Sequence, residues 1–317
     1  MACLQTKAGF EGRKEPAPYL VATEPRSERK NCIAIFYWRK SRHPEIDYYF
    51  PECKSPLMQK FCSVRLIPHE KIDLSIVVPV KNETDNIVEL AGEITEVMRK
   101  TSCSWECIWV DDGSTDTTPQ KLQKIQEKWE EHHYLILSKN FGQSAALAMG
   151  FAHARGKWFM MLDGDGQNDP HDIPNLLKTL STTSADVVNG WRKKRNDSFV
   201  RKISSRVANN FRNFITGDSI RDVGCSLRVM KREAIEGIPL FPGMHRFLPT
   251  LIRMNGFQNI VETPVNHRPR RFNKTKYGIY DRLWVGLVDL QGVRWLMKRR
   301  VYPTLRENTS PLLEKKI

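Results

Sequence analysis

Two carboxylates separated by a single glycine follow a short hydrophobic run near the middle of the chain. The run covers residues 158–162, and Asp163 and Asp165 come directly after it. Such a run predicts a buried strand that carries both carboxylates at its C-terminal end. Gly164 and Gly166 allow the chain to turn, so both carboxylates can face one centre. Paired carboxylate oxygens suit Mg²⁺ or Mn²⁺ bridging to a diphosphate, although the same residues could form a plain polar turn.

Acidic side chains follow two other predicted strands in the same way. Glu83 comes shortly after the apolar run 74–80, and Asp111 and Asp112 come directly after the run 105–110. Ligands of parallel α/β sheets bind outside the C-terminal ends of the strands. Carboxylates gathered in one crevice repel each other unless a cation lies among them. The shared position therefore favours a metal site over a polar turn.

The elements that must position these residues alternate between strand and helix. Apolar runs predict strands at residues 74–80, 105–110, 134–137, 158–162 and 186–189, with helical periodicity between them. This order predicts a doubly wound α/β domain with a mainly parallel sheet. The chain contains neither G-x-G-x-x-G nor G-x-x-x-x-G-K-[ST], so the usual support for a dinucleotide or P-loop site is missing.

The composition is that of a basic globular protein. The chain has 317 residues, of which 40% are hydrophobic, and its net charge is +14. This charge predicts anionic partners such as phosphates, nucleic acid or an acidic membrane surface. The 7 cysteines show no C-x-x-C spacing, which predicts reduced thiols and a cytosolic location. No run of 18 apolar residues and no signal-peptide pattern occur, so we expect no spanning helix.

The first part of the chain differs from the rest. Residues 1–72 are rich in Lys, Arg, Glu and Pro and show little periodicity, which predicts a loosely ordered extension. The cysteines and histidines in it do not have the spacing of a zinc site. Every motif described here lies beyond residue 73, so we expect residues 1–57 to be dispensable for catalysis.

Five motifs together resemble glycosyltransferase family 2. They cover residues 79–83, 111–116, 162–167, 222–228 and 267–270. More narrowly, the chain resembles the dolichol-phosphate mannosyltransferase-like and undecaprenyl-phosphate glycosyltransferase group over about residues 73–300. The resemblance implies a GT-A-type fold. It also implies an inverting enzyme that moves a hexose from a nucleotide-diphosphate sugar to a polyprenyl (dolichyl or undecaprenyl) phosphate at the membrane surface.

The same resemblance implies roles for individual residues. The divalent metal and the donor diphosphate would be held by Asp163, Asp165 and Gln167. The base and ribose of the donor would be held by Pro79, Asn82, Glu83, Asp111 and Asp112. Asp222 lies where the family places a carboxylate facing the sugar or the acceptor, and it would orient the nucleophile or serve as the base.

Two basic segments flank the predicted site. One runs from Arg192 to Arg206, and the other includes Arg268, Arg270 and Lys276. Arginine forks bind phosphate in a bidentate manner, so we expect the second segment to grip the donor diphosphate or the acceptor phosphate. The first segment would collect a lipid phosphate from the bilayer surface, although charge runs also occur on ordinary solvated faces.

An apolar and aromatic segment from about residue 280 to 300 predicts an amphipathic helix. Trp284, Leu287, Leu290 and Trp295 lie there among basic residues, a pattern typical of a helix in the membrane interface. A helix that packs on the core of the domain is the alternative.

These segments predict three regions. They are an extension at 1–72, a GT-A domain at 73–279, and a helix with a tail at 280–317. We expect the protein to be cytoplasmic and peripheral on the cytoplasmic face of a membrane, with attachment through a membrane subunit as the alternative.

Three other functions are alternatives to the transferase. A GT-A enzyme could use a soluble or protein-linked acceptor, a silent scaffold could bind a sugar nucleotide, and a basic protein could bind nucleic acid. The intact Glu83, Asp163 and Asp165 argue against the scaffold. Phe199 is the one aromatic residue between Arg192 and Arg206, so the interleaved aromatics of a nucleic-acid site are missing, and we expect no nucleic-acid partner. The sugar, the nucleotide and the oligomeric state stay open.

Overall fold

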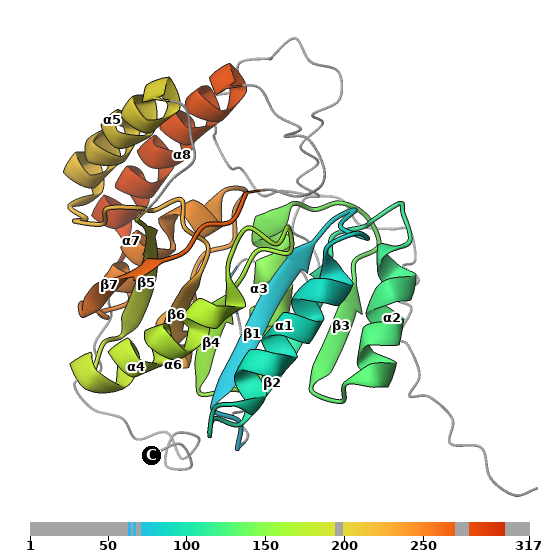
Figure 1. Cartoon of the computed structure of the whole chain (residues 1–317). Helices are drawn as coiled ribbons and strands as arrows, with labels where there is room; N and C mark the ends of the chain where they lie inside the picture. Colours follow the sequence, from blue (N-terminus) through green and yellow to red (C-terminus); the bar gives the residue numbers. More distant parts are fainter. Residues whose placement is uncertain (1–62, 65, 68–70, 194–198, 270–278, 302–317) are drawn as a thin grey trace, which may run out of the picture. The chain divides into compact units, whose positions relative to one another are not determined.

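A mainly parallel sheet lies at the centre of the computed structural model (Figure 1). Among the described residues it has seven strands in the order β3-β2-β1-β4-β6-β5-β7. They are β1 Leu74–Val80, β2 Trp105–Asp111, β3 His132–Ile136, β4 Trp158–Met161, β5 Val187–Arg192, β6 Arg228–Lys231 and β7 Ile260–Val265. Strand β6 runs antiparallel to β4 and β5, whereas the other pairs are parallel. The mainly parallel α/β sheet predicted from the alternation is confirmed.

The structure describes residues 63–64, 66–67, 71–193, 199–269 and 279–301. Side chains are described in the same ranges except at 199–207 and 279–284. The predicted extension over residues 1–72 lies almost wholly outside these ranges, and so do the predicted phosphate contacts Arg270 and Lys276. All described residues belong to one compact unit of the chain. The domain limits drawn from the sequence stay a prediction.

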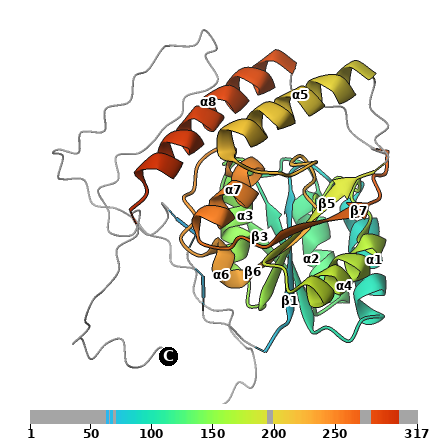
Figure 2. The same ribbon diagram turned by 90° about the vertical axis from the view of Figure 1, so that its left-hand side faces the viewer.

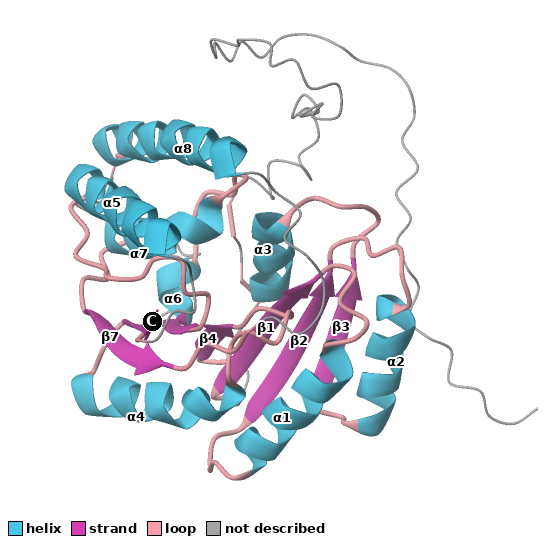
Figure 3. Ribbon diagram, turned by 45° about the horizontal axis from the view of Figure 1, so that its top comes forward, coloured by secondary structure: helices cyan, strands magenta, loops and turns pink. Residues whose placement is uncertain are grey.

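Helices cover both faces of the sheet. They are α1 Ile87–Arg99, α2 Thr118–Lys128, α3 Gln143–His153, α4 Ile173–Thr183, α5 Phe199–Thr216, α6 Arg232–Ile235, α7 Leu248–Met254 and α8 Ile279–Arg299, with 3-10 turns η2 Pro170–Asp172 and η3 Met244–Phe247. Helices α1, α2 and α4 pack on one face, and α3, α6 and α7 pack on the other (Figure 3). This layering is the one expected for strands joined by helical crossovers.

Two hydrophobic cores result, one on each face of the sheet. In β1, Ile76 and Val78 belong to the first core, whereas Val77 between them belongs to the second. Neighbouring side chains of a strand point to opposite faces, so a strand covered on both sides is apolar throughout. Ile87 of α1 fills the first core and Phe151 of α3 fills the second. The continuous apolar runs in the sequence therefore correspond to strands buried on both faces.

Helix α8 lies beside α5 (Figures 1 and 2). Leu290 and Val293 are 4% and 2% exposed and belong to the second core, whereas Val288 and Trp295 are 54% and 59% exposed. The helix predicted from 280 to 300 is confirmed as a helix. Its predicted amphipathic character is not confirmed, because apolar side chains occupy both its inner and its outer face. None of the described helices has the length and hydropathy required to cross a bilayer.

Candidate active site

The C-terminal ends of β1, β2 and β4 lie next to one another at one edge of the sheet. In the pairing of β1 with β2, Val80 stands opposite Asp111. In the pairing of β1 with β4, Val77 stands opposite Met161, and Asp163 follows two residues later. The structure thus brings to one edge the acidic residues that the sequence placed after these strands.

The loop from Asp163 to Gln167, after β4, is called the acidic loop below. Gly164 allows this loop to lie directly against the end of β1. A Cβ atom at this position would be 2.4 Å from Cγ1 of Val80 and 3.1 Å from the carbonyl oxygen of Pro79. Contacts of that kind require the neighbouring atoms to move, so any side chain would push the loop away from β1. Pro79, a predicted nucleotide-binding residue, therefore lies where the loops after β1 and β4 meet.

Asn82 joins the loop after β1 to the loop after β2. Its backbone N–H donates to Oγ of Ser114 at 2.8 Å, and its Oδ1 accepts from the backbone N–H of Thr115 at 2.8 Å. Its φ of +53° lies in the left-handed region, which asparagine tolerates better than most residues. Next to it, Glu83 is buried and accepts from Nδ2 of Asn86 at 2.6 Å. The contacts of Asn82 and Glu83 with a nucleotide stay a prediction.

Asp111 and Asp112 are buried and engage neighbouring loops. Asp111 accepts from the backbone N–H and the hydroxyl of Ser114. Asp112 accepts from the backbone N–H groups of Phe141 and Gly142 at 2.7 and 2.9 Å. Burial raises the pKa of both carboxyls, and these hydrogen bonds act in the opposite direction. The two residues fix the backbone of the edge, whatever they contact in the donor.

A small hydrogen-bond network holds the carboxylates of the acidic loop. Oδ1 of Asp163 accepts from Nε2 of Gln143, the first residue of α3, at 2.9 Å. The backbone N–H of Asp163 donates to Oδ1 of Asn168 at 3.0 Å. Oδ1 of Asp165 accepts from the backbone N–H of Gln167 at 3.1 Å. These bonds shape the loop and orient the first carboxylate.

The electrostatics of this loop fit a divalent cation. Burial, together with the charge of Asp165, raises the pKa of Asp163 to about 6, and the positive charges of Arg192 and Arg228 oppose this rise. Two crowded carboxylates with hard oxygen donors are the kind of site that Mg²⁺ or Mn²⁺ relieves of repulsion. Among the described residues, no cluster of three or more His, Cys, Asp or Glu side chains could hold a metal. The candidate protein donors are thus the pair Asp163 and Asp165.

Asp222, in the loop before β6, faces a guanidinium. Its Oδ2 accepts from Nε of Arg192 at 2.7 Å, and its Oδ1 accepts from Nη2 of the same residue at 2.8 Å. The side chains of Asp222 and Arg192 are 10% and 15% exposed. The predicted action of Asp222 on the nucleophile stays a prediction.

Arg268 lies between two carboxylates. Its Nη1 is 2.7 Å from Oε2 of Glu93 on α1, and its Nη2 is 2.6 Å from Oδ1 of Asp169. Burial lowers the pKa of Arg268, but the hydrogen bonds and charges of these two acids outweigh it and raise the pKa. The backbone N–H of Arg268 also donates to the carbonyl of Gln167 at 2.9 Å. Arg268 therefore ties the segment after β7 to the acidic loop, and its contact with a phosphate stays a prediction.

Some supporting residues were missed in the sequence. Asn168 stands five residues after Asp163, directly after the motif 162–167, so its position next to Gln167 is a signal that could have found it. Gln143 and Glu93 lie on helices far from the acidic motif, and nothing in their local patterns marks them.

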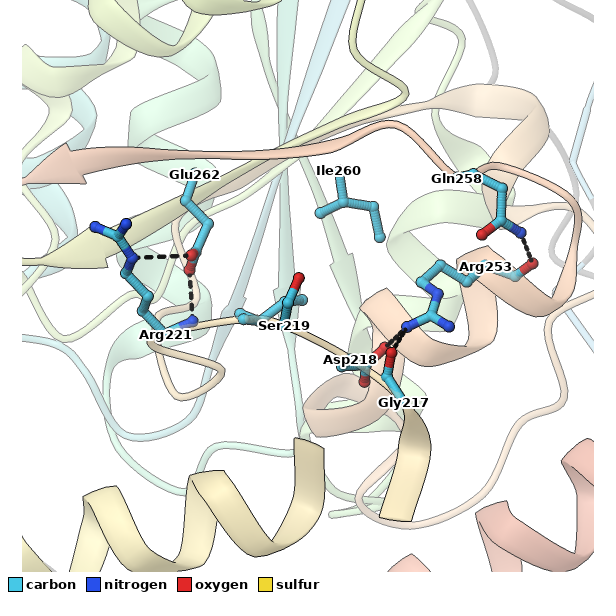
Figure 4. Close-up of a pocket in the computed structure, with 9 residues that line it drawn as sticks. Gly217, Asp218, Ser219, Arg221, Arg253, Gln258, Ile260 and Glu262 are labelled. Atoms are coloured by element: carbon cyan, nitrogen blue, oxygen red, sulfur yellow. Dashed lines mark hydrogen bonds and ion pairs between the residues drawn. The ribbon is translucent and has the colours of Figure 1, made fainter. Parts of the chain in front are cut away.

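A polar cavity of about 450 Å³ lies elsewhere, between the loop 217–221, α7 and β7 (Figure 4). Inside it, Nη1 of Arg253 donates to Oδ1 of Asp218 at 2.6 Å, and Arg221 faces Glu262. The cavity contains none of the predicted site residues. Its charged groups are paired with each other, so the acidic edge of the sheet is the stronger candidate site.

Comparison with known proteins identifies the family of the chain. The sequence model of the family "Glycosyl transferase family 2" matches residues 75–238. A dodecaprenyl-phosphate galacturonate synthase of Rhizobium johnstonii is 37% identical over 74% of this chain and 70% of its own length. An undecaprenyl-phosphate 4-deoxy-4-formamido-L-arabinose transferase of Salmonella choleraesuis is 34% identical over 64% of this chain. The chain spans only 62% of the length of that relative.

Solved structures with low sequence identity share the fold. A glucosyl-3-phosphoglycerate synthase of Mycobacterium tuberculosis, in complex with Mn²⁺, UDP-glucose and phosphoglyceric acid, aligns with a TM-score of 0.55 at 18% identity. The alignment covers 72% of this chain and 80% of the synthase. A mannosyl-3-phosphoglycerate synthase of Rubrobacter xylanophilus aligns with a TM-score of 0.55 at 15% identity over 76% of this chain and 79% of its own.

Proposed function

The chain belongs to glycosyltransferase family 2, and we propose that it transfers a sugar from a nucleotide-diphosphate donor to a polyprenyl phosphate. Its fold is of the GT-A type, as the resemblance implied. The observation that carries the proposal is the pair Asp163 and Asp165, held at the sheet edge beside the loops after β1 and β2. Both named relatives carry a polyprenyl phosphate in their names, which supports this acceptor class. That the sugar is a hexose stays a prediction.

We place the divalent cation, Mg²⁺ or Mn²⁺, on Asp163 and Asp165. Solved structures of the same fold contain Mn²⁺ with UDP-glucose, or Mg²⁺ with UDP, which supports a metal-assisted donor site. When bound, the cation supplies Lewis-acid stabilisation of the departing diphosphate. Gln143 orients the carboxylate of Asp163, and Asn168 holds the backbone N–H of Asp163. The carboxylate oxygens that would bind the cation are therefore aligned before the sugar nucleotide binds.

The donor nucleoside would bind along the loops after β1 and β2. The residues proposed for it are Pro79, Asn82, Glu83, Asp111 and Asp112, and the additional phosphate contacts proposed are Gln167, Arg268, Arg270 and Lys276. The pairing of Asn82 with Ser114 and Thr115 holds the two loops in one arrangement. Such preorganisation lowers the cost of ordering the site when the donor binds.

The transfer step needs no strong base on the protein. An acceptor phosphate has a second pKa of about 6, so it is largely a dianion near neutral pH. A lone pair of its oxygen forms the new bond to the anomeric carbon, while the bond from that carbon to the diphosphate breaks and its electron pair leaves with the nucleotide. No proton has to be removed from the nucleophile. Catalysis then depends on positioning and on charge stabilisation.

A membrane surface would deliver the acceptor, and the outer face of α5 and α8 suits it. The exposed apolar side chains are Phe211 and Phe214 on α5 and Val285, Val288 and Trp295 on α8. Helix α8 also carries the exposed cations Arg294, Lys298 and Arg299. Apolar groups beside cations favour contact with an anionic bilayer. We therefore propose peripheral attachment on the cytoplasmic face of a membrane.

The burial of the α8 side chains contradicts one expectation from the sequence. Leu290, predicted to enter the lipid, is 4% exposed and packs in the core, so that prediction was wrong. Leu287 and Trp295 are 40% and 59% exposed, in line with the prediction. The side chain of Trp284 lies outside the described residues.

A transfer assay tests the proposed function. The full chain is incubated with Mn²⁺ or Mg²⁺, radiolabelled UDP-sugars or GDP-mannose, and undecaprenyl phosphate in detergent, with 3-phosphoglycerate as the soluble comparison acceptor. We expect a chloroform-soluble sugar phosphate that forms only with the lipid acceptor and disappears with EDTA. Transfer to the soluble acceptor alone, or nucleotide release without a lipid product, would overturn the proposal.

A further inference from the structure

A largely buried ion pair lies at the same edge of the sheet as the acidic loop, on the far side of β6. Arg192 is the last residue of β5, and its guanidinium meets the carboxylate of Asp222 in a two-pronged contact. We propose that Asp222 is a positioning residue, which holds Arg192 as a phosphate-binding group, and that it is not the base of the reaction. This inference rests on the proposed transfer to a phosphate acceptor. The phosphate could belong to the donor diphosphate or to the acceptor, and the experiment below separates the two.

Both oxygens of Asp222 are committed to Arg192. Oδ2 accepts from Nε and from the backbone N–H of Arg192, and Oδ1 accepts from Nη2, at distances of 2.7, 3.2 and 2.8 Å. Removing a proton from an acceptor would require one of these charge-assisted bonds to break. Charge-assisted forks are among the stronger contacts in proteins, so a role through Arg192 is the simpler one.

The turn that carries Asp222 is braced from three strands. Nη2 of Arg228 on β6 donates to the carbonyls of residues 223 and 225 at 3.2 and 2.7 Å. Nδ2 of Asn189 on β5 donates to the carbonyl of Asp222 at 3.4 Å. Glu262 on β7 accepts from the backbone N–H of Arg221 at 2.9 Å. A turn braced in this way fixes the direction of the Asp222 carboxylate.

Gly224 leaves room for the guanidinium. A Cβ atom at Gly224 would lie 3.0 Å from Nη2 of Arg192 and 3.6 Å from Oδ1 of Asp222. A side chain there would press on the ion pair, and the nearest atom belongs to the donor of the fork. The turn is therefore shaped around the guanidinium as well as around the carboxylate.

The register of the sheet places Arg192 across from the acidic loop. Met161 of β4, Arg228 of β6 and Asn189 of β5 stand in one row. Asp163 follows Met161 by two residues, and Arg192 follows Asn189 by three, so both leave the sheet at the same edge. Two strand spacings separate them, about 10 Å between backbones.

This placement gives Arg192 a chemical task. A phosphate that approaches the anomeric carbon of a donor bound at the acidic loop arrives between the loop and the end of β5. Arginine remains charged at any working pH and presents its N–H groups in a fixed plane. The carboxylate of Asp222 sets that plane, so losing it costs orientation while the positive charge remains.

The test is a double-mutant cycle with Asp222→Asn, Arg192→Lys and the double variant, in the full chain. Asp186→Asn is the matched control, because Asp186 pairs with Lys231 at 2.6 Å just before β5, at the opposite end of the same strand. We expect each single variant to lower kcat/KM by about tenfold to a hundredfold, and the double variant to be no worse than the poorer single one. The control should keep the wild-type rate.

Two further measurements separate positioning from base catalysis. The pH profile of kcat/KM for Asp222→Asn should keep the acidic limb of the wild type, since that limb belongs to the acceptor phosphate. Calorimetric binding of UDP with Mn²⁺ to Arg192→Lys shows which phosphate Arg192 contacts. An unchanged UDP affinity together with a raised KM for the polyprenyl phosphate assigns Arg192 to the acceptor. Weakened UDP binding assigns it to the donor.

Loss of the acidic limb in Asp222→Asn, or additive effects in the cycle, would overturn the inference. So would full activity of Arg192→Lys beside an inactive Asp222→Asn. Asp222→Glu serves as a second variant if Asp222→Asn does not fold, because it keeps the charge and should retain part of the rate if the residue only positions Arg192. A wild-type chain that makes no lipid product refutes the proposed function instead, so the two failures are distinguishable.

Discussion

The side chain of Gln143 donates from Nε2 to Oδ1 of Asp163 across 2.9 Å. Gln143 opens α3, and the residues just before it, Phe141 and Gly142, donate their backbone N–H groups to Asp112. A carboxylate after β2 thus fixes the start of a helix whose first side chain orients the carboxylate after β4. The acidic loop is preorganised from outside its own motif.

This relationship predicts the behaviour of Gln143→Leu. The fold should persist, because the side chain is partly exposed, but Asp163 should lose its orienting bond. A hydrogen bond to a charged carboxylate is worth about 1.5–3 kcal/mol, so the apparent Kd for Mn²⁺ in the presence of UDP should rise about tenfold to a hundredfold. Calorimetric titration with Mn²⁺ measures it. Asn175→Leu on α4, whose side chain lies at an exposed site, is the control, and equal metal affinity in both variants would contradict the orienting role.

Metal dependence rests on Asp165. Asp165→Asn should leave the melting temperature within a few degrees of the wild type and reduce transfer by at least about a hundredfold, since the leaving diphosphate loses its electrostatic stabilisation. The measurement is sugar transfer with saturating Mn²⁺, and with EDTA as the reference. Activity of Asp165→Asn in EDTA equal to the wild type in Mn²⁺ would refute the metal site.

Gly164 offers a test of the loop geometry. Gly164→Ala places a Cβ atom 2.4 Å from Val80 Cγ1, so we expect a loss of about 1–3 kcal/mol in the free energy of unfolding, together with weaker donor binding. Gly292→Ala on α8 is the matched control, because no atom lies within 4 Å of its added Cβ. Alanine favours a helix more than glycine, so the control should gain up to about 1 kcal/mol. Chemical denaturation of both variants decides the matter.

His132 predicts a pH dependence of stability. Its Nδ1 accepts from Nε1 of Trp109 at 2.9 Å, and its Nε2 lies 2.9 Å from Oγ1 of Thr95 in a fully buried site. Burial lowers the pKa of His132 from 6.5 to about 4. The folded state therefore prefers the neutral ring, and the stabilisation is complete above pH 6.5 and declines as the pH falls towards 4.

The size of this effect follows from the difference in pKa. About 2.5 pH units correspond to about 3 kcal/mol in the free energy of unfolding between pH 6.5 and 4. Urea unfolding at several pH values, with His132→Gln for comparison, isolates the contribution. The variant should show a flatter profile in that window, and identical slopes for both proteins would contradict the assignment.

Exposed side chains on α5 and α8 should respond to truncation differently from a buried side chain on α8. Trp295→Ala and Phe214→Ala remove side chains that are 59% and 87% exposed, so stability should change little while binding to anionic vesicles weakens. Leu290→Ala removes a buried side chain and should cost about 2–4 kcal/mol of stability. Sedimentation with vesicles of increasing phosphatidylserine content, at low and high salt, measures the first effect. A folded wild type that ignores such vesicles would point to a membrane subunit instead.

The sequence was informative where the pattern is local. Continuous apolar runs located the buried strands, because a strand covered on both faces has apolar side chains along its whole length. The acidic residues at the ends of β1, β2 and β4 could be placed together because parallel strands end at one edge. Strand β6 was not predicted: it is short, and its pairing with β4 joins residues about 70 positions apart.

Contacts across long separations were also out of reach. Arg268 meets Glu93 across 175 residues, and Arg192 meets Asp222 across 30. Charge patterns along the chain show that arginines are present, but only the folded backbone decides which carboxylate each one faces. In the same way, the spacing of residues on α8 could not distinguish Leu290 in the core from Trp295 in solvent. Helical periodicity shows which residues share a face of a helix, but it does not show whether that face contacts the protein core or solvent.

The antiparallel strand β6 has a consequence for the order in which the sheet is completed. Strands β1 to β4 pair among themselves within residues 74–161, so the part that carries the acidic loop can pair before the residues that follow it have been synthesised. Strand β6 then inserts between β4 and β5, and it arrives later because it lies later in the chain, at Arg228–Lys231. During synthesis the donor half of the sheet would emerge and fold first. The turn at Asp222, and with it the clamp on Arg192, would form later, leaving a stage in folding at which the acidic loop is present but the arginine proposed to bind phosphate is not yet held in place.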